Sequence, residues 1–542
     1  MEEEDKTMKK KLLTLGTVLA AMTLTACGQA NGSKAKTSLN LMESDVVASL
    51  DTSATASIPQ WDTLVQTMAG LYKSDKNDNP VPAMAKSYKK SKDGTRYTFY
   101  LRKAKWSNGD QVTAQDFVTA WRKGVSPTAM SGYNYIFKGI KNAAAVSSGK
   151  KKASTLGVKA LDAHTLQVDL EYPMPTFVQK MVMPAFYPMD TQLVAKYGKK
   201  YGMTSKAMAF NGAFKVTGWK NTDEKWHLVK NKFYYAASEV KLQTMNYQVV
   251  KDSNTAHQLF EQGSLDDATV TGTTAQGLQK SKNLYHLYRS GNDFLNVNMA
   301  KGKTLSNVDL RHALYLVMDR NQLAKKVLAD GSKASYTFSA PNAAKYPGTK
   351  TDFAKKAQPT ETYNVAKAKK LWAKGLKEAG LKSVTLTLVT SDTTTDKNVG
   401  EFVQSQVQGK LSNVKVEVKS LPSKSSMNLV TTGKYDLYLS LWLNDYADPI
   451  SELETLQSDN SHNYGKYEST AFNQQLNLAR SKNATTTKAY FANLLAAQKQ
   501  MNKDYPVLPL YTMVEDHLVK SNLKGVLWHK VGMVDYTRAY FK

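Results

Sequence analysis

The feature that most constrains the fold is a run of strands alternating with helices between Tyr363 and Leu443. Apolar residues recur with helical spacing in two stretches, and three others have the composition of strands. Helices are expected over residues 366–380 and 399–411, and strands over 384–389, 414–418 and 435–443. Strands separated by helices favour a parallel sheet, because the chain must cross over between them. We therefore expect an α/β lobe with a largely parallel sheet.

The rest of the chain also mixes strands and helices. Residues 97–101 (YTFYL) predict a strand, and Thr113 with Asp116 is close to a capping box at the start of a helix. A further helix is predicted over residues 308–329, between an asparagine cap and a closing glycine. Three aromatic side chains are expected in the core: Trp106, Phe117 and Trp121.

The N-terminal part of the sequence has the pattern of a secretory signal. A basic stretch (Met8 to Lys11) precedes the apolar run LLTLGTVLAAMTLTA, which is too short to remain as a membrane span. The run ends at Cys27, the single cysteine of the 542 residues, so no disulfide can form within the chain. Residues 24–27 (LTAC) resemble the lipobox of bacterial lipoproteins, in which the cysteine sulfur carries a diacylglycerol. Two or more acyl chains anchor a protein stably; the alternative is an ordinary signal with a chance cysteine.

The net charge of +27 raises the question of an anionic partner. Nucleic acid is not expected, because the lysines are spread along the whole chain without an arginine-rich block or a recognition motif. A surface suited to anionic lipid heads or cell-wall polymers is one interpretation, and solubility alone is another.

Catalytic motifs occur only as fragments. Ser87–Lys90 fits SxxK and Ser458–Asn460 fits SDN, but the KTG motif of penicillin-binding enzymes is missing. Gly302–Thr304 matches the end of the phosphate-loop motif, but Val297 occupies the position of the first glycine of that motif. No GxSxG or HExxH occurs, and the eight histidines are scattered singly. We expect a protein that is not an enzyme and has no metal or cofactor.

Four separated stretches resemble the signature segments of the oligopeptide-binding proteins of ABC importers. They occur in the family's order and, with PVLPLY at residues 506–511, they span nearly the whole chain beyond Cys27. The stretches are YTFYLRKAKWSNGDQVTAQDFVTAWRK (97–123), NGAFKVTGWKNTDEKWHLVKNKFYY (211–235), NVDLRHALYLVMDRNQLAKKVLADG (307–331) and WLNDYADP (442–449).

The resemblance implies a fold of the type II periplasmic-binding class, with two lobes, a hinge of two crossovers and an inserted subdomain. About 515 residues beyond Cys27 are also too many for one compact core. The expected organisation is a signal peptide (1–26), a lipid-anchored linker (27–36), lobe I in three parts (37–72, 206–291 and 505–542), an inserted subdomain (73–205) and lobe II (292–504).

By the same resemblance, Asp445 is expected to bind the α-ammonium of a peptide. A carboxylate and an ammonium form charge-assisted hydrogen bonds, which are stronger than neutral ones. A bound peptide would lie as an additional strand between two protein segments. The residues expected to contact it are Trp442, Leu443, Asn444, Ala56, Ser57, Ile58, Tyr133, Tyr135 and Tyr511. The alternative for Asp445 is an N-cap of the segment that follows.

The implied function is a lipid-anchored, monomeric receptor on the extracytoplasmic face of a bacterial, Gram-positive membrane. It would deliver short peptides to the permease subunits of an ABC transporter. Leu439 stands where some family members carry an arginine, and Pro422 and Ser423 stand where an aromatic residue is frequent. Other ligands therefore stay open: a signal peptide, a muropeptide, a nickel complex or a sugar. A basic surface adhesin and a cell-wall hydrolase are the remaining alternatives.

Overall fold

The computed structural model describes residues 36–54, 57–130, 132–300, 304–481 and 486–542. Residues 37–542 form one compact unit, which is the subject of all that follows. The predictions for Cys27, the signal peptide and Ala56 concern residues outside the described ranges.

A six-stranded sheet contains the region that the alternation of helices and strands had indicated. Its strand order is β14-β18-β13-β17-β15-β16. The strands are β13 (Gly291–Val297), β14 (Lys333–Ala334), β15 (Val384–Ser391), β16 (Val414–Leu421), β17 (Leu437–Leu443) and β18 (Val507–Thr512). Only β15 with β16 and β15 with β17 pair in parallel; β13 is antiparallel to both of its neighbours. The expectation of a largely parallel sheet is therefore wrong for half of the strands.

Helices cover this sheet and bury its apolar side chains. Helix α12 packs on α9, α13 packs on β15 and β16, and α14 packs on β15. Their bounds are α9 (Val308–Val317), α12 (Val365–Glu378), α13 (Thr394–Lys410) and α14 (Ser423–Thr431). The helix predicted over 308–329 breaks at Met318, and the chain continues as the short α10 (Arg320–Gln322) and a π-helical turn (Leu323–Leu328).

Two further sheets come from the first half of the chain. One has the order β1-β10-β9-β8 and the other has the order β4-β5-β7-β6. The first consists of β1 (Ser38–Glu43), β8 (Phe214–Thr217), β9 (Lys225–Lys230) and β10 (Thr244–Val249), and the second of β4 (Ala85–Lys90), β5 (Arg96–Leu101), β6 (Val158–Asp162) and β7 (Thr165–Asp169). Two small two-stranded sheets are formed by β2 (Tyr72–Ser74) with β3 (Pro80–Pro82) and, from the C-terminal part of the sequence, by β20 (Leu523–Lys524) with β21 (Tyr540–Phe541).

The capping box predicted at Thr113 is present at the start of α3 (Ala114–Gly124). Asp116 accepts a hydrogen bond from the backbone of Thr113 at 2.9 Å and another from the indole Nε1 of Trp106 at 3.2 Å. Trp106, Phe117 and Trp121 are buried in the core, as predicted.

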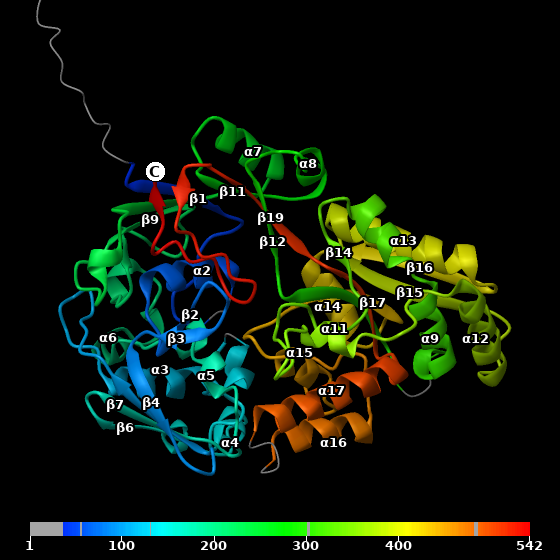
Figure 1. Cartoon of the computed structure of the whole chain (residues 1–542), viewed down its shortest axis with the longest axis horizontal. Helices are drawn as coiled ribbons and strands as arrows, with labels where there is room; N and C mark the ends of the chain where they lie inside the picture. Colours follow the sequence, from blue (N-terminus) through cyan, green and yellow to red (C-terminus); the bar gives the residue numbers. More distant parts are fainter. Residues whose placement is uncertain (1–35, 55–56, 131, 301–303, 482–485) are drawn as a thin grey trace, which may run out of the picture. The chain divides into compact units, whose positions relative to one another are not determined.

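Two adjacent strands connect the halves (Figure 1). Strand β12 (Leu284–Tyr288) leads directly into β13, and β18 leads directly into β19 (Val514–Val519). Because β12 pairs with β19 and β13 pairs with β18, the two crossovers run side by side. Gly291 begins β13 where the backbones approach closely: a Cβ atom there would lie 2.6 Å from the backbone oxygen of Trp442.

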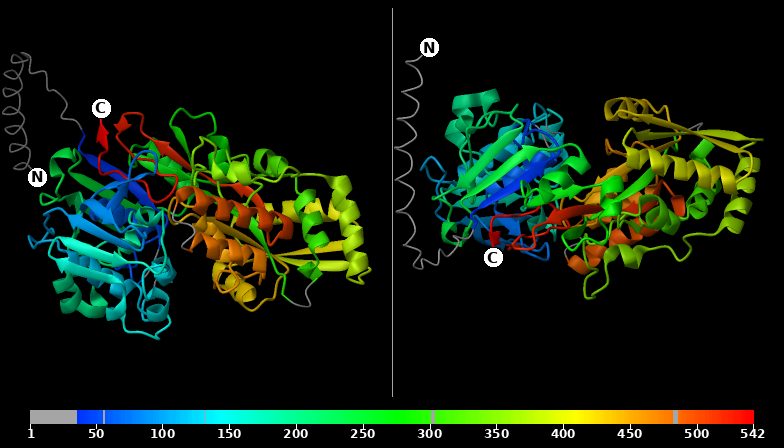
Figure 2. Two further views of the ribbon diagram at one scale, coloured as in Figure 1. Left: turned by 60° about the horizontal axis from the view of Figure 1, so that its bottom comes forward. Right: turned by 90° about the horizontal axis from the view of Figure 1, so that it is seen from above.

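The remaining helices lie around these sheets (Figure 2). Helix α2 (Ile58–Thr67) packs near β8, and α7 (Ser253–Glu261) packs on β11 (Asp267–Val270), the third strand of the β12–β19 sheet. Helices α16 (Thr470–Ala479) and α17 (Thr487–Asp504) pack against each other. The shorter helices are α4 (Ala143–Ser147), α5 (Phe177–Lys180), α6 (Thr191–Tyr197), α8 (Gly272–Gly277), α11 (Phe353–Ala357) and α15 (Ile450–Leu453). Within the described ranges, no helix has both the length and the apolar character needed to cross a membrane.

Candidate functional site

Asp445 lies just beyond the end of β17 and receives two tyrosine hydroxyl groups. Tyr135 donates to its Oδ2 at 2.8 Å and Tyr133 donates to its Oδ1 at 3.1 Å. Both tyrosines belong to a 3₁₀ turn (Tyr133–Phe137), more than three hundred positions earlier in the chain. The backbone N–H of Asp445 donates to Ser451 Oγ at 3.1 Å, which fixes the turn that presents the carboxyl group. Three of the residues expected from the sequence are therefore brought together.

The carboxyl group of Asp445 is 9% exposed, and its surroundings do not neutralise it. Burial raises the pKa of Asp445 to about 6, and the hydrogen bonds from Tyr135 and Tyr133 counteract only part of that effect. The more distant Glu454 raises the pKa further and Lys180 lowers it. Among the described residues no cation forms an ion pair with Asp445. An incoming ammonium group would supply the missing positive charge.

Asp445 does not cap the helix that follows it. Helix α15 begins at Ile450 with Pro449 as its N-cap residue, and the carboxylate that accepts from the Ile450 N–H belongs to Asp448. This excludes the alternative reading of Asp445 as an N-cap.

Aromatic side chains form a continuous series next to Asp445. The ring of Trp61 in α2 lies 4.8 Å from Tyr133, and Tyr133 lies 5.3 Å from Tyr135. His462 continues the series at 5.6 Å from Tyr135 and 5.2 Å from Trp442, all distances being between ring centroids. Trp61 and His462 were missed by the sequence analysis. Trp61 could have been found from its position one helical turn after Ile58, whereas nothing in the sequence distinguishes His462.

One edge of β17 is open near Asp445. Hydrogen bonds at both ends, from Asn444 N to Ser290 O at 2.8 Å and from Asn298 N to Asp436 O at 2.9 Å, show that the even-numbered residues face β13. The odd-numbered residues therefore direct their backbone groups to the other edge. There β15 pairs with Leu437 and Tyr438 only, so in the described part of the chain no strand covers the edge at Leu441 and Leu443. An extended ligand could add to this edge as a further strand.

Of the expected peptide contacts near the start of α2, Ser57 and Ile58 lie within the described residues. Ser57 is the N-cap residue, and its Oγ accepts from Gln60 N at 3.4 Å. Ile58 is 52% exposed, which is unusual for a large apolar side chain. The cap fixes the entry of the helix and leaves Ile58 at the surface.

Asn444 and Tyr511 have structural contacts instead. Asn444 ties the end of β17 to the crossover, because its Nδ2 donates to Ser290 Oγ at 3.0 Å. Tyr511 lies in β18, is 4% exposed within the core of the six-stranded sheet, and shares a side-chain hydrogen bond with Asp293. The structure does not bring Tyr511 to the aromatic series beside Asp445.

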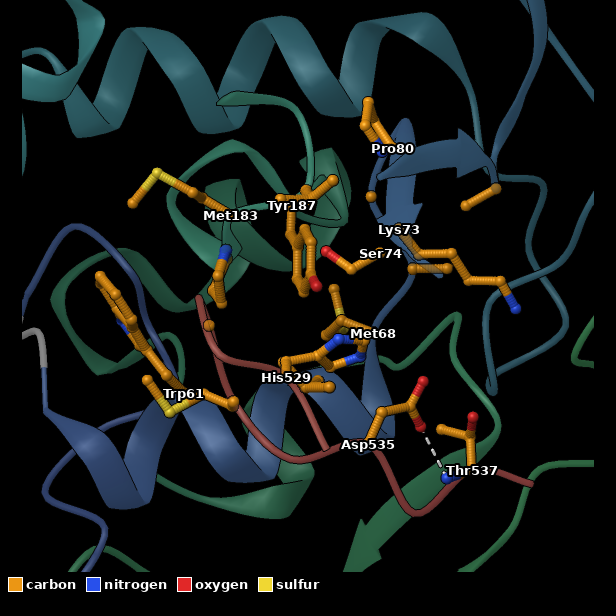
Figure 3. A pocket seen from close by; sticks show the side chains of 18 of the residues that line it. Trp61, Met68, Lys73, Ser74, Pro80, Met183, Tyr187, His529, Asp535 and Thr537 are labelled. Carbon is orange, nitrogen blue, oxygen red and sulfur yellow. Dashed lines mark hydrogen bonds between the residues drawn. The ribbon is translucent and has the colours of Figure 1, made fainter. Parts of the chain in front are cut away.

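A cavity borders α2 on the face that carries Trp61 and Met68. It contains about 950 Å³ of empty space that is partly open to solvent (Figure 3). Its wall combines apolar and aromatic side chains, including Trp61, Met68, Met183 and Tyr187. Asp445 and Ala447 also line it, so the candidate carboxyl group borders this space. The polar part contains His529, whose Nδ1 lies 2.8 Å from Asp78 Oδ1.

Among the described residues, no group of three or more histidine, cysteine, aspartate or glutamate side chains has an arrangement that could hold a metal ion.

Comparisons with known proteins find relatives that align along nearly the whole chain. The sequence model of a protein family, described as bacterial extracellular solute-binding proteins, family 5 Middle, matches residues 79–464. A dipeptide-binding protein of Lactococcus lactis is 32% identical over 555 aligned residues, covering 98% of this chain and 99% of that relative. The oligopeptide-binding protein OppA of Bacillus subtilis is 30% identical and is covered completely.

Solved structures show the same fold. The structure described as Listeria monocytogenes OppA bound to peptide superposes with a TM-score of 0.80 at 32% identity, covering 94% of this chain and 99% of that one. The pheromone receptor PrgZ superposes with a TM-score of 0.81 at 34% identity, covering 94% and 100%. The expected two-lobed α/β fold of the type II periplasmic-binding class is thereby confirmed.

Proposed function

Because this chain belongs to family 5 of the bacterial extracellular solute-binding proteins, we propose that it is a receptor that binds short peptides and delivers them to an ABC importer. The observation that supports this most is the carboxyl group of Asp445, which forms no ion pair among the described residues and stands at the end of the open edge of β17. The carboxylate would hold the peptide α-ammonium, and the edge would bind the peptide backbone. Affinity would then depend little on the peptide sequence.

The first experiment is to purify the protein natively and identify the co-purifying ligand by mass spectrometry. A peptide is the expected result, whereas a sugar, a nickel complex or another non-peptide ligand would overturn the proposal. PrgZ is named as a pheromone receptor, so the sequences recovered would also separate a mixed nutrient pool from a single signalling peptide.

The second experiment tests the role of Asp445 by calorimetry with tri- to hexapeptides. The Asp445→Asn substitution should weaken binding of peptides with a free amino group by about ten- to a hundredfold, since it removes a charge-assisted bond in a buried site. N-acetylated peptides lack the ammonium and should lose much less. Asp436→Asn, which changes the carboxylate that accepts from Thr387 N at the other end of β17, is a control for a general effect on this strand.

The lipid anchor is a second part of the proposal. It is supported by the position of Cys27 at the end of an apolar run that follows a basic stretch. Cys27 would carry the acyl chains and hold a monomeric receptor on the outer face of a Gram-positive membrane. Cys27→Ser should release the protein into the medium and abolish palmitate labelling while peptide affinity stays unchanged. Retention of the variant in the membrane fraction would contradict the anchor.

The assignment of lobes is also a proposal, with one change from the sequence-based boundaries. Strand β18 pairs with β13 and β14 inside the six-stranded sheet. The third part of lobe I therefore begins after Thr512 rather than at residue 505. The region between β18 and β19, at Met513, is then one crossover of the hinge, and Arg289–Ser290 is the other.

A further inference from the structure

A second pocket lies between the start of α2 and the strands β1, β10, β11 and β19. It contains about 1170 Å³ of empty space, partly open to solvent. We name it the acidic pocket after four of its carboxyl groups, those of Glu43, Asp62, Asp267 and Glu515; Asp252 and Lys251 also line it. None of these residues was predicted to have a functional role.

Two of the four carboxyl groups are neutralised within the protein. His517 lies between Asp267 and Glu515, with its Nδ1 2.8 Å from Asp267 Oδ1 and its Nε2 2.9 Å from Glu515 Oε1. Asp267 also accepts from the Tyr536 hydroxyl at 2.8 Å, and Arg289 lies 3.7 Å from Glu515. These two carboxyl groups therefore have cationic partners.

Glu43 and Asp62 do not have such partners. Their side chains hydrogen-bond to each other, and no ion pair to either occurs in the described ranges. Burial and the proximity of Asp62 raise the pKa of Glu43 well above its usual range, and burial and Glu515 raise the pKa of Asp62 to about 7. Two adjacent carboxyl groups without an ion-pair partner resist ionisation, and a cationic group placed beside them would favour their ionised forms.

Tyr247 provides independent evidence for a ligand. It lines the acidic pocket, is 3% exposed, and its buried hydroxyl has no hydrogen-bond partner within the described chain. Its ring is stacked on Trp226 with 5.2 Å between the centroids, which fixes its direction. Burial, and after it the nearby charges of Asp62 and Glu43, raise the pKa of this hydroxyl well above its usual range. A buried hydroxyl without a partner is costly, and an N–H donor of a ligand in the pocket would satisfy it.

The pocket adjoins the segment proposed to contact the peptide. Ile58 lines it, and Asp62 follows one turn later on the same face of α2. Its wall also contains the apolar side chains of Leu41, Met42, Val250 and Met513, beside polar residues that include Lys251 and Ser253. Apolar walls and an acidic end are complementary to a side chain with an aliphatic stem and a cationic head.

We propose that the acidic pocket binds the lysine or arginine side chain of a bound peptide, an inference that rests on the proposed function. Glu43, Asp62 and the Tyr247 hydroxyl would contact the cationic head, and the apolar walls would contact its stem. The receptor would then combine tolerance of most peptide sequences with a preference for a basic residue at one position.

The test compares tripeptides of alanine in which one position carries either lysine or norleucine, which has a similar stem without the charge. At one of the three positions, calorimetry should show lysine binding about ten- to a hundredfold more tightly, as for a hydrogen-bonded charge. Asp62→Asn should reduce that ratio to about one and leave the norleucine affinity unchanged. Glu43→Gln should act in the same direction, and it serves as the second variant if Asp62→Asn does not fold.

Asp45→Asn is the matched control. Asp45 lies two positions after Glu43 and is exposed, with Lys251 3.6 Å away, so the lysine preference should persist in this variant. Equal affinities for lysine and norleucine at every position would overturn this inference and leave peptide binding intact. If the wild type bound none of the tripeptides or longer peptides, the proposed function itself would fail.

Discussion

At the scale of single residues, the proposed role of Asp445 predicts that peptide binding depends on pH. The pKa of its carboxyl group is about 6 in the unliganded protein, and an ammonium ligand requires the ionised form. The affinity for free-amine peptides should therefore be constant above pH 6 and fall by up to tenfold per unit below it. N-acetylated peptides serve as the reference, because their affinity reports every other group that titrates in this range, including Asp448.

The tyrosine hydroxyls set the midpoint of that dependence. Tyr135→Phe removes the 2.8 Å hydrogen bond that favours the ionised carboxylate, so the pKa of Asp445 should rise and the loss of affinity should begin at a higher pH. Calorimetry between pH 5 and 8 measures the shift. Tyr438→Phe, which changes a tyrosine of β17 without a bond to Asp445, should leave the midpoint in place; an equal shift in both variants would contradict this role.

The sequence located some of these residues and not others, for physical reasons. Asp445, Tyr133 and Tyr135 stand in or near recognisable stretches, and the structure brings them together. Trp61 and His462 complete the aromatic series through contacts between distant segments, which no local pattern records. Tyr511 was expected near the ligand because it lies in a matching stretch, but its side chain faces the core.

At the scale of elements, the proposed pairing of the peptide backbone with the open edge of β17 can be tested. Leu441→Pro removes one N–H that faces this edge and none of those that face β13. Every peptide should lose affinity by a similar factor, about five- to tenfold for one hydrogen bond. Leu441→Ala keeps the N–H and should bind normally, and thermal melting checks that the sheet is intact. A loss confined to certain peptide sequences would argue against backbone pairing.

Elements with strong local signals were predicted well. The strand at β5, the capped helix α3 and the succession α12, β15, α13, β16 and β17 all appear close to the expected bounds. The relative direction of the strands was not predicted well. Strands β13 and β18 come from distant parts of the chain, and β13 pairs in antiparallel with both β17 and β18. The predicted helix over 308–329 broke because Arg320 is buried and donates to backbone carbonyls of Tyr315, Met318, Thr362 and Pro509, which fixes an irregular turn.

At the scale of the whole molecule, side-chain contacts connect segment 73–205 to the region around Asp445. The hydroxyls of Tyr133 and Tyr135 bond to Asp445, and Thr176 Oγ1 donates to Asp448. The combined substitutions Tyr133→Phe, Tyr135→Phe and Thr176→Val remove these bonds. They should let the two halves of the molecule separate by rotation about the two crossovers. Small-angle scattering should then show a larger radius of gyration without ligand. Thr119→Val, which removes a bond to Thr191 within the same segment, should leave the radius unchanged.

The position of β18 has a consequence for how the protein is exported. This strand lies between β13 and β14, in the interior of the six-stranded sheet, yet its residues 507–512 are among the last to be synthesised. The sheet cannot close before residues 507–512 are available for pairing, since this pairing requires contacts of long sequence separation. Slow completion of the core would keep the polypeptide unfolded long enough to pass through a narrow translocation channel.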